Sequence, residues 1–209
     1  DRAGYDIPGL SVTDKNKITQ VCEPCESIEE GEKIGAQLFK ELSDKGIGLA
    51  ANQIGINKRV CVVNVKEPIV LINPEIVEKS KDMFGFIEGC LSFPTDTVKT
   101  QRHKWVKVKA DNHKTTLHFT TLSDDSEDDY DKDKYLETAY ETACVQHEID
   151  HLDGITMHDR KLVLEPWKRR DLKIGRNTKV LIKKGSESKT IKYKKFDKMK
   201  DAGWTLVEV

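Results

Sequence analysis

Apolar residues recur with a helical period in the first quarter of the chain. Ser27, a residue type that often caps helices, is followed by apolar residues every fourth position from Ile34 to Leu42. This spacing places them on one face of a helix. Glu30 lies three residues after Ser27, as in a capping box. The pattern predicts an amphipathic helix that begins near Ser27 and is ended by Gly46.

A second pattern consists of short apolar and β-branched runs between turn-forming residues, which predicts β-strands. In the run at residues 105–110, apolar and polar residues alternate, and residues 111–114 suit a hairpin turn into the next run, residues 116–122. A Gly-rich loop at residues 46–55 precedes all of these runs. The predicted strands are residues 59–65, 69–77, 105–110 and 116–122.

The second half of the chain predicts further elements. A second helix is expected over residues 134–152, a short basic helix over 166–174, and a basic hairpin over 179–196 around Gly185 and Ser186. We therefore expect an α+β fold, with small antiparallel or mixed β-sheets around one central helix and a basic C-terminal extension. Residues 1–165 would form the main domain, and residues 166–209 an extension packed on it.

Composition narrows the class of protein. Of the 209 residues, 37% are hydrophobic and 34% are charged, as in a water-exposed chain with a modest core. No run approaches the roughly 18 apolar residues of a membrane span. Five cysteines, an odd number, argue against a disulfide scaffold and for a reducing compartment. Cys22 and Cys25 form a C-x-x-C pair, which we interpret as two ordinary thiols because no second pair completes a four-sulfur site.

The formal net charge of −1 hides an uneven distribution. Residues 123–134 contain seven acidic side chains, whereas residues 160–200 contain sixteen Lys or Arg and four acidic residues. The acidic run is interpreted as a solvated loop. The basic region is either a solvated surface or a surface for an anionic partner.

The segment QHEIDH, residues 146–151, contains candidate metal ligands. His147 and His151 are four residues apart, so a helix brings both imidazoles to one face, where they can share an ion. Glu148 follows the first histidine, where its carboxylate can reach a water bound to that ion. Val145, Ile149 and Leu152 would pack this helix into apolar surroundings. The pattern predicts a metal site.

The third ligand is less obvious. One zinc-protease pattern needs a histidine at position 157, but Met157 stands there and His158 is one residue late. Glu165 and Glu187 lie downstream, in no convincing helical context. Cys90, in the turn-like segment EGCLS, is a better candidate. A thiolate with two imidazoles leaves one coordination position open for water, which is the catalytic arrangement.

Three motifs stand in order along the chain: GIGLAANQ at residues 46–53, EGCLS at 88–92 and QHEIDH at 146–151. Together they closely resemble those of the peptide deformylases, which remove the formyl group from the N-terminal formyl-Met of new proteins. The resemblance covers roughly residues 18–160. It implies that Cys90, His147 and His151 hold one divalent metal ion, Fe²⁺ in the cell and Zn²⁺ or Ni²⁺ in some preparations.

The resemblance also implies a mechanism and a substrate site. Metal-activated hydroxide would attack the formyl carbon, and Glu148 would take the proton and pass it to the leaving amine. The side chain of Gln53 and the backbone N–H of Leu91 would stabilise the oxyanion. A peptide would lie alongside as an extra strand. The expected substrate-binding residues, by the same resemblance, are Gly46, Ile47, Gly48, Gly89, Leu91, Ala143 and Cys144.

Two positions depart from the family pattern. Many relatives carry an arginine shortly after the cysteine motif, where this chain has residues 94–97 (PTDT) and places Arg102 later. Asn52 stands where Pro or Thr is common, which we expect to be harmless.

Two other functions are compatible with parts of the pattern. An H-E-x-x-H metallopeptidase that cuts internal peptide bonds would retain its metal in Cys90→Ala. A binding module would sit on the ribosome or on RNA through the basic region. We also expect, as a hypothesis, that residues 161–184 help an active enzyme dock on ribosomes. No membrane partner and no specific nucleic-acid sequence are expected. The expected location is cytoplasmic, or organellar if a transit peptide was removed.

Overall fold

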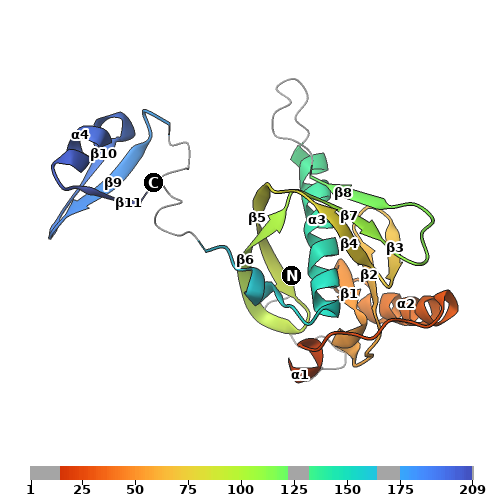
Figure 1. Ribbon diagram of the computed structural model, residues 1–209. Helices are drawn as coiled ribbons and strands as arrows, with labels where there is room; N and C mark the ends of the chain where they lie inside the picture. The colour runs from red at the N-terminus through yellow and green to blue at the C-terminus, as the bar shows by residue number, and fades with distance from the viewer. Residues whose placement is uncertain (1–14, 122–131, 164–174, 209) are drawn as a thin grey trace. The chain divides into compact units, whose positions relative to one another are not determined.

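The computed structural model describes residues 15–121, 132–163 and 175–208 (Figure 1). The chain divides into two compact units, Asp1–Leu162 and Val163–Val209. The first unit contains the three motifs. None of the described helices is long and apolar enough to cross a membrane.

The predicted N-terminal helix is present as α2, Ile28–Leu42, after a short α1, Lys15–Ile18. The Ser27 hydroxyl accepts the backbone N–H of Glu30 at 3.1 Å, and the Glu30 carboxylate accepts the N–H of Glu26 at 2.8 Å. The prediction that Gly46 ends the helix is wrong. Ser43 takes a positive φ of 44° and its N–H bonds the carbonyl of Phe39, so the helix ends at Leu42.

The Gly-rich loop contains the short strand β1, Gly48–Ala50, and the 3-10 turn η1, Ala51–Ile54. β1 pairs antiparallel with β2, Val60–Asn64, which pairs with β3, Pro68–Ile72. The single strand predicted over residues 69–77 is wrong. Asn73 has a φ of 51° and Pro74 follows it, so the chain leaves this sheet after Ile72.

The chain then enters a second sheet of order β4-β7-β8. Its strands are β4, Glu75–Lys79, β7, Trp105–Lys109, and β8, Leu117–Thr120. The last two confirm the predicted strands at 105–110 and 116–122, and they are joined as predicted through residues 111–114. Between β4 and β7 in sequence, β5, Met83–Cys90, and β6, Phe93–His103, form a long antiparallel hairpin that the sequence pattern did not predict.

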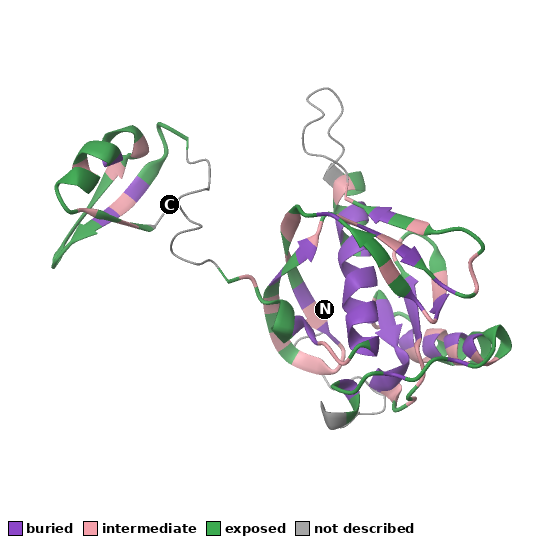
Figure 2. Ribbon diagram, in the orientation of Figure 1, coloured by how far each residue is buried: buried purple, intermediate pink, exposed green. Residues whose placement is uncertain are grey.

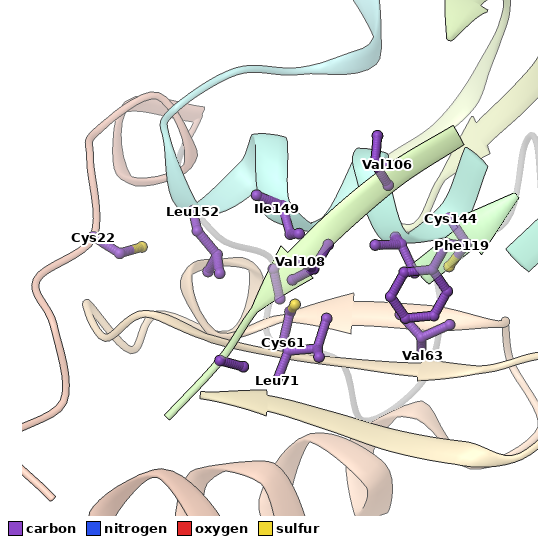
Figure 3. Packing of buried hydrophobic residues seen from close by; sticks show 13 residues of the cluster. Cys22, Cys61, Val63, Leu71, Val106, Val108, Phe119, Cys144, Ile149 and Leu152 are labelled. Atoms are coloured by element: carbon purple, nitrogen blue, oxygen red, sulfur yellow. The ribbon is translucent and has the colours of Figure 1, made fainter. Parts of the chain in front are cut away.

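The central element of the first unit is α3, Lys132–Leu152, which confirms the helix predicted over residues 134–152 (Figure 1). Residues 141–152 are all buried, so this part of the helix is enclosed on every side (Figure 2). Cys144, Ile149 and Leu152 join an apolar cluster with side chains of β2, β3, β7 and β8 (Figure 3). Other α3 side chains bond to the β5–β6 hairpin. The 3-10 turn η2, Met157–Arg160, follows the helix.

The second unit has its own small core of Val180, Ile182 and Phe196. The basic hairpin predicted over residues 179–196 is present but ends at Lys192: its strands are β9, Lys179–Lys184, and β10, Glu187–Lys192, with Gly185 and Ser186 between them. Three later elements were not predicted: η4, Tyr193–Lys195, α4, Phe196–Asp201, and β11, Thr205–Glu208, which pairs with β9. The predicted helix at 166–174 and most of the acidic run lie outside the described residues.

Candidate metal centre

A cavity of about 410 Å³ opens between β1, the end of β5 and α3. Phe86, Ile87 and Tyr140 also line it, although the sequence did not single them out. The Phe86 and Tyr140 rings meet edge to face with centroids 5.0 Å apart. Phe86 and Ile87 were missed because β5 itself was not predicted, whereas Tyr140 lies on the predicted helix α3 but outside the three motifs. Every residue expected to bind substrate lines this cavity: Gly46, Ile47, Gly48, Gly89, Leu91, Ala143 and Cys144.

Cys90, His147 and His151 converge beside this cavity. The Cys90 sulfur lies 3.3 Å from Nε2 of His151, which lies 3.0 Å from Nε2 of His147. One donor atom from each residue falls within 4.8 Å of the others, and all three side chains are buried. Cys90 is the last residue of β5 rather than part of a turn, while the histidines are one turn apart on α3.

The donor set fits a divalent metal ion. Nδ1 of His147 lies 2.8 Å from the Glu88 carboxylate. Burial would raise the pKa of Glu88, but hydrogen bonds from Arg102 and His147 outweigh it and lower that pKa to about 2. A neutral His147 that donates from Nδ1 to this anion carries its lone pair on Nε2, facing Cys90 and His151. Thiolate and imidazole donors in this arrangement suit Zn²⁺, Fe²⁺ and Ni²⁺.

His158 lies elsewhere. Its Nε2 is 2.8 Å from the Asp96 carboxylate, and its ring packs against Phe93. The one-residue slip after Gly154 therefore removes it from the cluster, as the sequence predicted. Glu187 belongs to the second unit, and Glu165 lies outside the described residues.

Glu148 follows the first histidine and lines the same cavity. Its Oε1 is 4.0 Å from Nε2 of His147, and its Oε2 is buried with no hydrogen-bond partner among the described residues. Burial raises the pKa of Glu148 to about 7. Buried oxygens without a partner are rare in folded proteins, and a catalytic role is one of the reasons for keeping one.

Gln53 is oriented by the backbone of its own loop. Its Oε1 accepts the N–H of Ala50 at 2.9 Å, which turns its amide nitrogen the other way. That nitrogen lies 3.1 Å from the Ser92 hydroxyl and 3.6 Å from the Cys90 sulfur. Leu91 occupies the turn between β5 and β6, beside these groups.

Three further polar side chains connect α3 to the elements around it by hydrogen bonds. The sequence either did not single them out or indicated another role for them. The Asn52 amide donates to the carbonyl of His151 at 2.6 Å, which ties the Gly-rich loop to α3. The Gln146 side chain bonds both the N–H and the carbonyl of His103, each at 2.9 Å. Arg102 is buried and does not line the cavity; it bonds Glu88 and Asp150 instead.

Comparison with known proteins identifies the family. The family model "Polypeptide deformylase" matches residues 9–169. The chain belongs to the peptide deformylase family. A peptide deformylase of Heliobacterium modesticaldum is 44% identical over 117 residues, which are 56% of this chain and 67% of that protein. A peptide deformylase of Bartonella tribocorum is 32% identical over 169 residues, 73% of this chain and 86% of that protein.

The fold agrees with this family. The crystal structure of peptide deformylase from Thermotoga maritima matches with a TM-score of 0.61 and 28% identity, covering 74% of this chain and 98% of that one.

Proposed function

We propose that this chain removes the formyl group from formyl-methionyl peptides, releasing formate and a free amino terminus. The observation that carries this proposal is the convergence of Cys90, His147 and His151 at the wall of a cavity that Glu148 and Gln53 also line. Membership of the peptide deformylase family supports it. Cys90, His147 and His151 would hold a divalent ion, which would supply Lewis-acid chemistry and activate water for attack. We propose Fe²⁺ as the ion in the cell.

Glu148 acts as the general base and acid. Its carboxyl group lines the cavity, with Oε1 4.0 Å from Nε2 of the first histidine ligand, where it can accept a proton from the attacking water. The same carboxyl group then delivers that proton to the leaving amine nitrogen, so Glu148 returns to its starting protonation state at the end of the reaction.

Gln53 and Leu91 stabilise the charge that develops on the formyl oxygen. Because the Gln53 carbonyl is held by Ala50, its amide nitrogen is aimed at the metal ligands and is preorganised as a donor. The backbone N–H of Leu91 is the second donor. Donors fixed in place before reaction are the most effective stabilisers of a developing oxyanion.

The substrate is an extended peptide. β1 is an edge strand of its sheet, and residues of both β1 and β5 line the cavity. Main-chain hydrogen bonds to such an edge accept many sequences, which suits a substrate class that shares only its first residue. Apolar side chains of Ile47, Leu91, Ala143 and Cys144 supply the wall for the methionine.

We also propose that the basic segment at residues 161–184 docks the enzyme on ribosomes. Lys179, Lys183 and Lys184 are exposed on β9, which supports this role. Contacts with phosphates weaken steeply with salt because counterions are released on binding. Reversing the charge of these lysines should abolish salt-sensitive pelleting with ribosomes; unchanged pelleting would contradict the docking proposal.

Formate release from a short formyl-Met peptide tests the main proposal. The protein is loaded anaerobically with Fe²⁺, and Glu148→Ala is compared with Glu137→Ala, an exposed acid on the same helix that does not line the cavity. Loss of the general base should lower turnover by about 10²–10⁴-fold, whereas the control should remain active. Cleavage of internal peptide bonds without formate release would favour a metallopeptidase.

A further inference from the structure

A network of paired charged side chains extends from the surface to the metal centre. Arg160 bonds both oxygens of Asp150, through Nε and Nη2, at 3.0 Å each. Asp150 accepts Nη1 of Arg102 at 2.5 Å. Arg102 in turn donates from Nε and Nη2 to the two oxygens of Glu88, both at 2.7 Å. Glu88 ends the chain at Nδ1 of His147.

The inner members of this network are almost completely buried. The side chains of Arg102 and Glu88 are 2% and 4% exposed, and that of Asp150 is 9% exposed. Every carboxylate oxygen has a partner, and the Thr100 hydroxyl adds a further bond to Glu88. Buried ion pairs lose much of their attraction to desolvation, and apolar residues of similar size are often as stabilising. Stability alone is therefore a weak reason for this arrangement.

The two ends of the network face different cavities. Glu88 lines the cavity of the metal centre, whereas Asp150 and Arg160 line a second cavity of about 410 Å³. Arg102 lies between them and lines only the second. Arg160 is in η2, its side chain is 43% exposed, and Leu162, where the first unit ends, follows two residues later.

We propose that Asp150 and Arg160 are positioning residues that control how firmly His147 holds the metal. They act through Arg102, which fixes both oxygens of Glu88, so that Glu88 holds Nδ1 of His147 and leaves Nε2 facing the other ligands. Arg102 alone could orient Glu88 by its two hydrogen bonds. The addition of Asp150 and Arg160 makes the orientation of His147 depend on a half-exposed residue that lines the second cavity. This inference rests on the metal site of the proposed function.

The experiment measures metal loss rather than turnover alone. The protein is loaded with Zn²⁺, and the rate of transfer to excess chelator is followed for Asp150→Asn, Arg160→Gln and Arg160→Lys. Asp153→Asn and Arg59→Gln are the matched controls. Asp153 pairs with Arg59 at 2.6 Å close to the same end of α3, and no hydrogen bond or ion pair found in the described residues links this pair to Glu88. Urea unfolding of the metal-free proteins measures their stability separately.

Asp150→Asn should release metal several-fold faster, which is less than the about 10–100-fold cost of removing a direct partner of a ligand, because Asp150 acts through Arg102 and Glu88. Arg160→Gln should show a smaller increase, and Arg160→Lys should fall between it and the unaltered protein, because lysine keeps the charge but not the two-pronged bond. The controls should release metal at the unaltered rate even where they unfold at lower urea concentration.

Equal release from all five variants, or release that follows urea stability across them, would overturn the positioning role. If the unaltered protein binds no metal, the proposed function itself fails. If it binds metal tightly and the variants match the controls, only this inference fails.

Discussion

Gly48 is the residue whose replacement should most directly displace the general base. A Cβ atom at this position would lie 2.6 Å from the Cys144 sulfur and 3.0 Å from both Cγ and Oε1 of Glu148. The backbone of Gly48 does not have a positive φ, so the cost of Gly48→Ala is steric rather than conformational. The sulfur must move by about 0.4 Å to reach even a 3.0 Å contact, and Glu148 must also give way.

Two magnitudes follow from these distances. Overpacking of this kind destabilises a core by about 1–3 kcal/mol. Misplacing a catalytic group by about 1 Å can cost about 10²-fold in rate, so a shift of a few tenths of an ångström at Glu148 predicts a loss of about 10-fold in kcat. The loss should fall mainly on kcat because the displaced group acts in the chemical step.

The assay is formate release with matched metal loading, together with urea unfolding. Gly46→Ala is the control, because Gly46 lines the same cavity but a Cβ there would meet nothing closer than 3.4 Å. Adding Cys144→Ala to Gly48→Ala removes the closest clash, so stability should partly return while the contact with Glu148 remains. Gly48→Ala with the kcat and stability of Gly46→Ala would refute the steric argument.

Three further predictions concern single side chains. Gln53→Ala should lower kcat by about 10²–10³-fold with little change in KM, because it removes one oxyanion donor; steady-state formate release checks this, and an unchanged kcat would contradict it. Cys90→Ala should lose the metal during dialysis, measured as metal per chain by atomic absorption, whereas a retained ion would point to a different third ligand. Gln146→Ala should lower the free energy of unfolding by about 1–3 kcal/mol, because two backbone groups of the half-buried His103 lose their partner; urea unfolding of the metal-free protein measures it, and an unchanged midpoint would argue against this anchor.

The sequence predicted those elements whose apolar residues carry a regular period. α2 has a cap and a spaced apolar face, and β7 alternates apolar and polar residues. The β5–β6 hairpin was missed because its buried positions are largely polar: Glu88, Thr100 and Arg102 are among its most buried residues. A pattern search that counts apolar residues therefore finds no strand there. The break at Asn73 depends on a positive φ that no apolar pattern records.

The residues of the candidate site also differ in whether a local sequence pattern could predict them. The spacing of His147 and His151 predicted their shared helix face from local geometry. Cys90 was a candidate from the chemistry of its thiolate, but only the family resemblance assigned it as the third ligand, because 61 residues separate it from His151 in sequence. Asp150, Arg102 and Arg160 resembled ordinary surface charges in a chain that is 34% charged. Only the three-dimensional arrangement shows them as one connected network.

The complete enclosure of residues 141–152 has a consequence for the tolerance of this segment to mutation. A helix with one solvent face accepts substitutions every three or four residues, so a scan of all single substitutions shows a helical period. This part of α3 has no solvent face. A mutational scan should therefore give an almost unbroken block of sensitive positions here, and tolerant positions only toward the largely exposed start of the helix, residues 133–137.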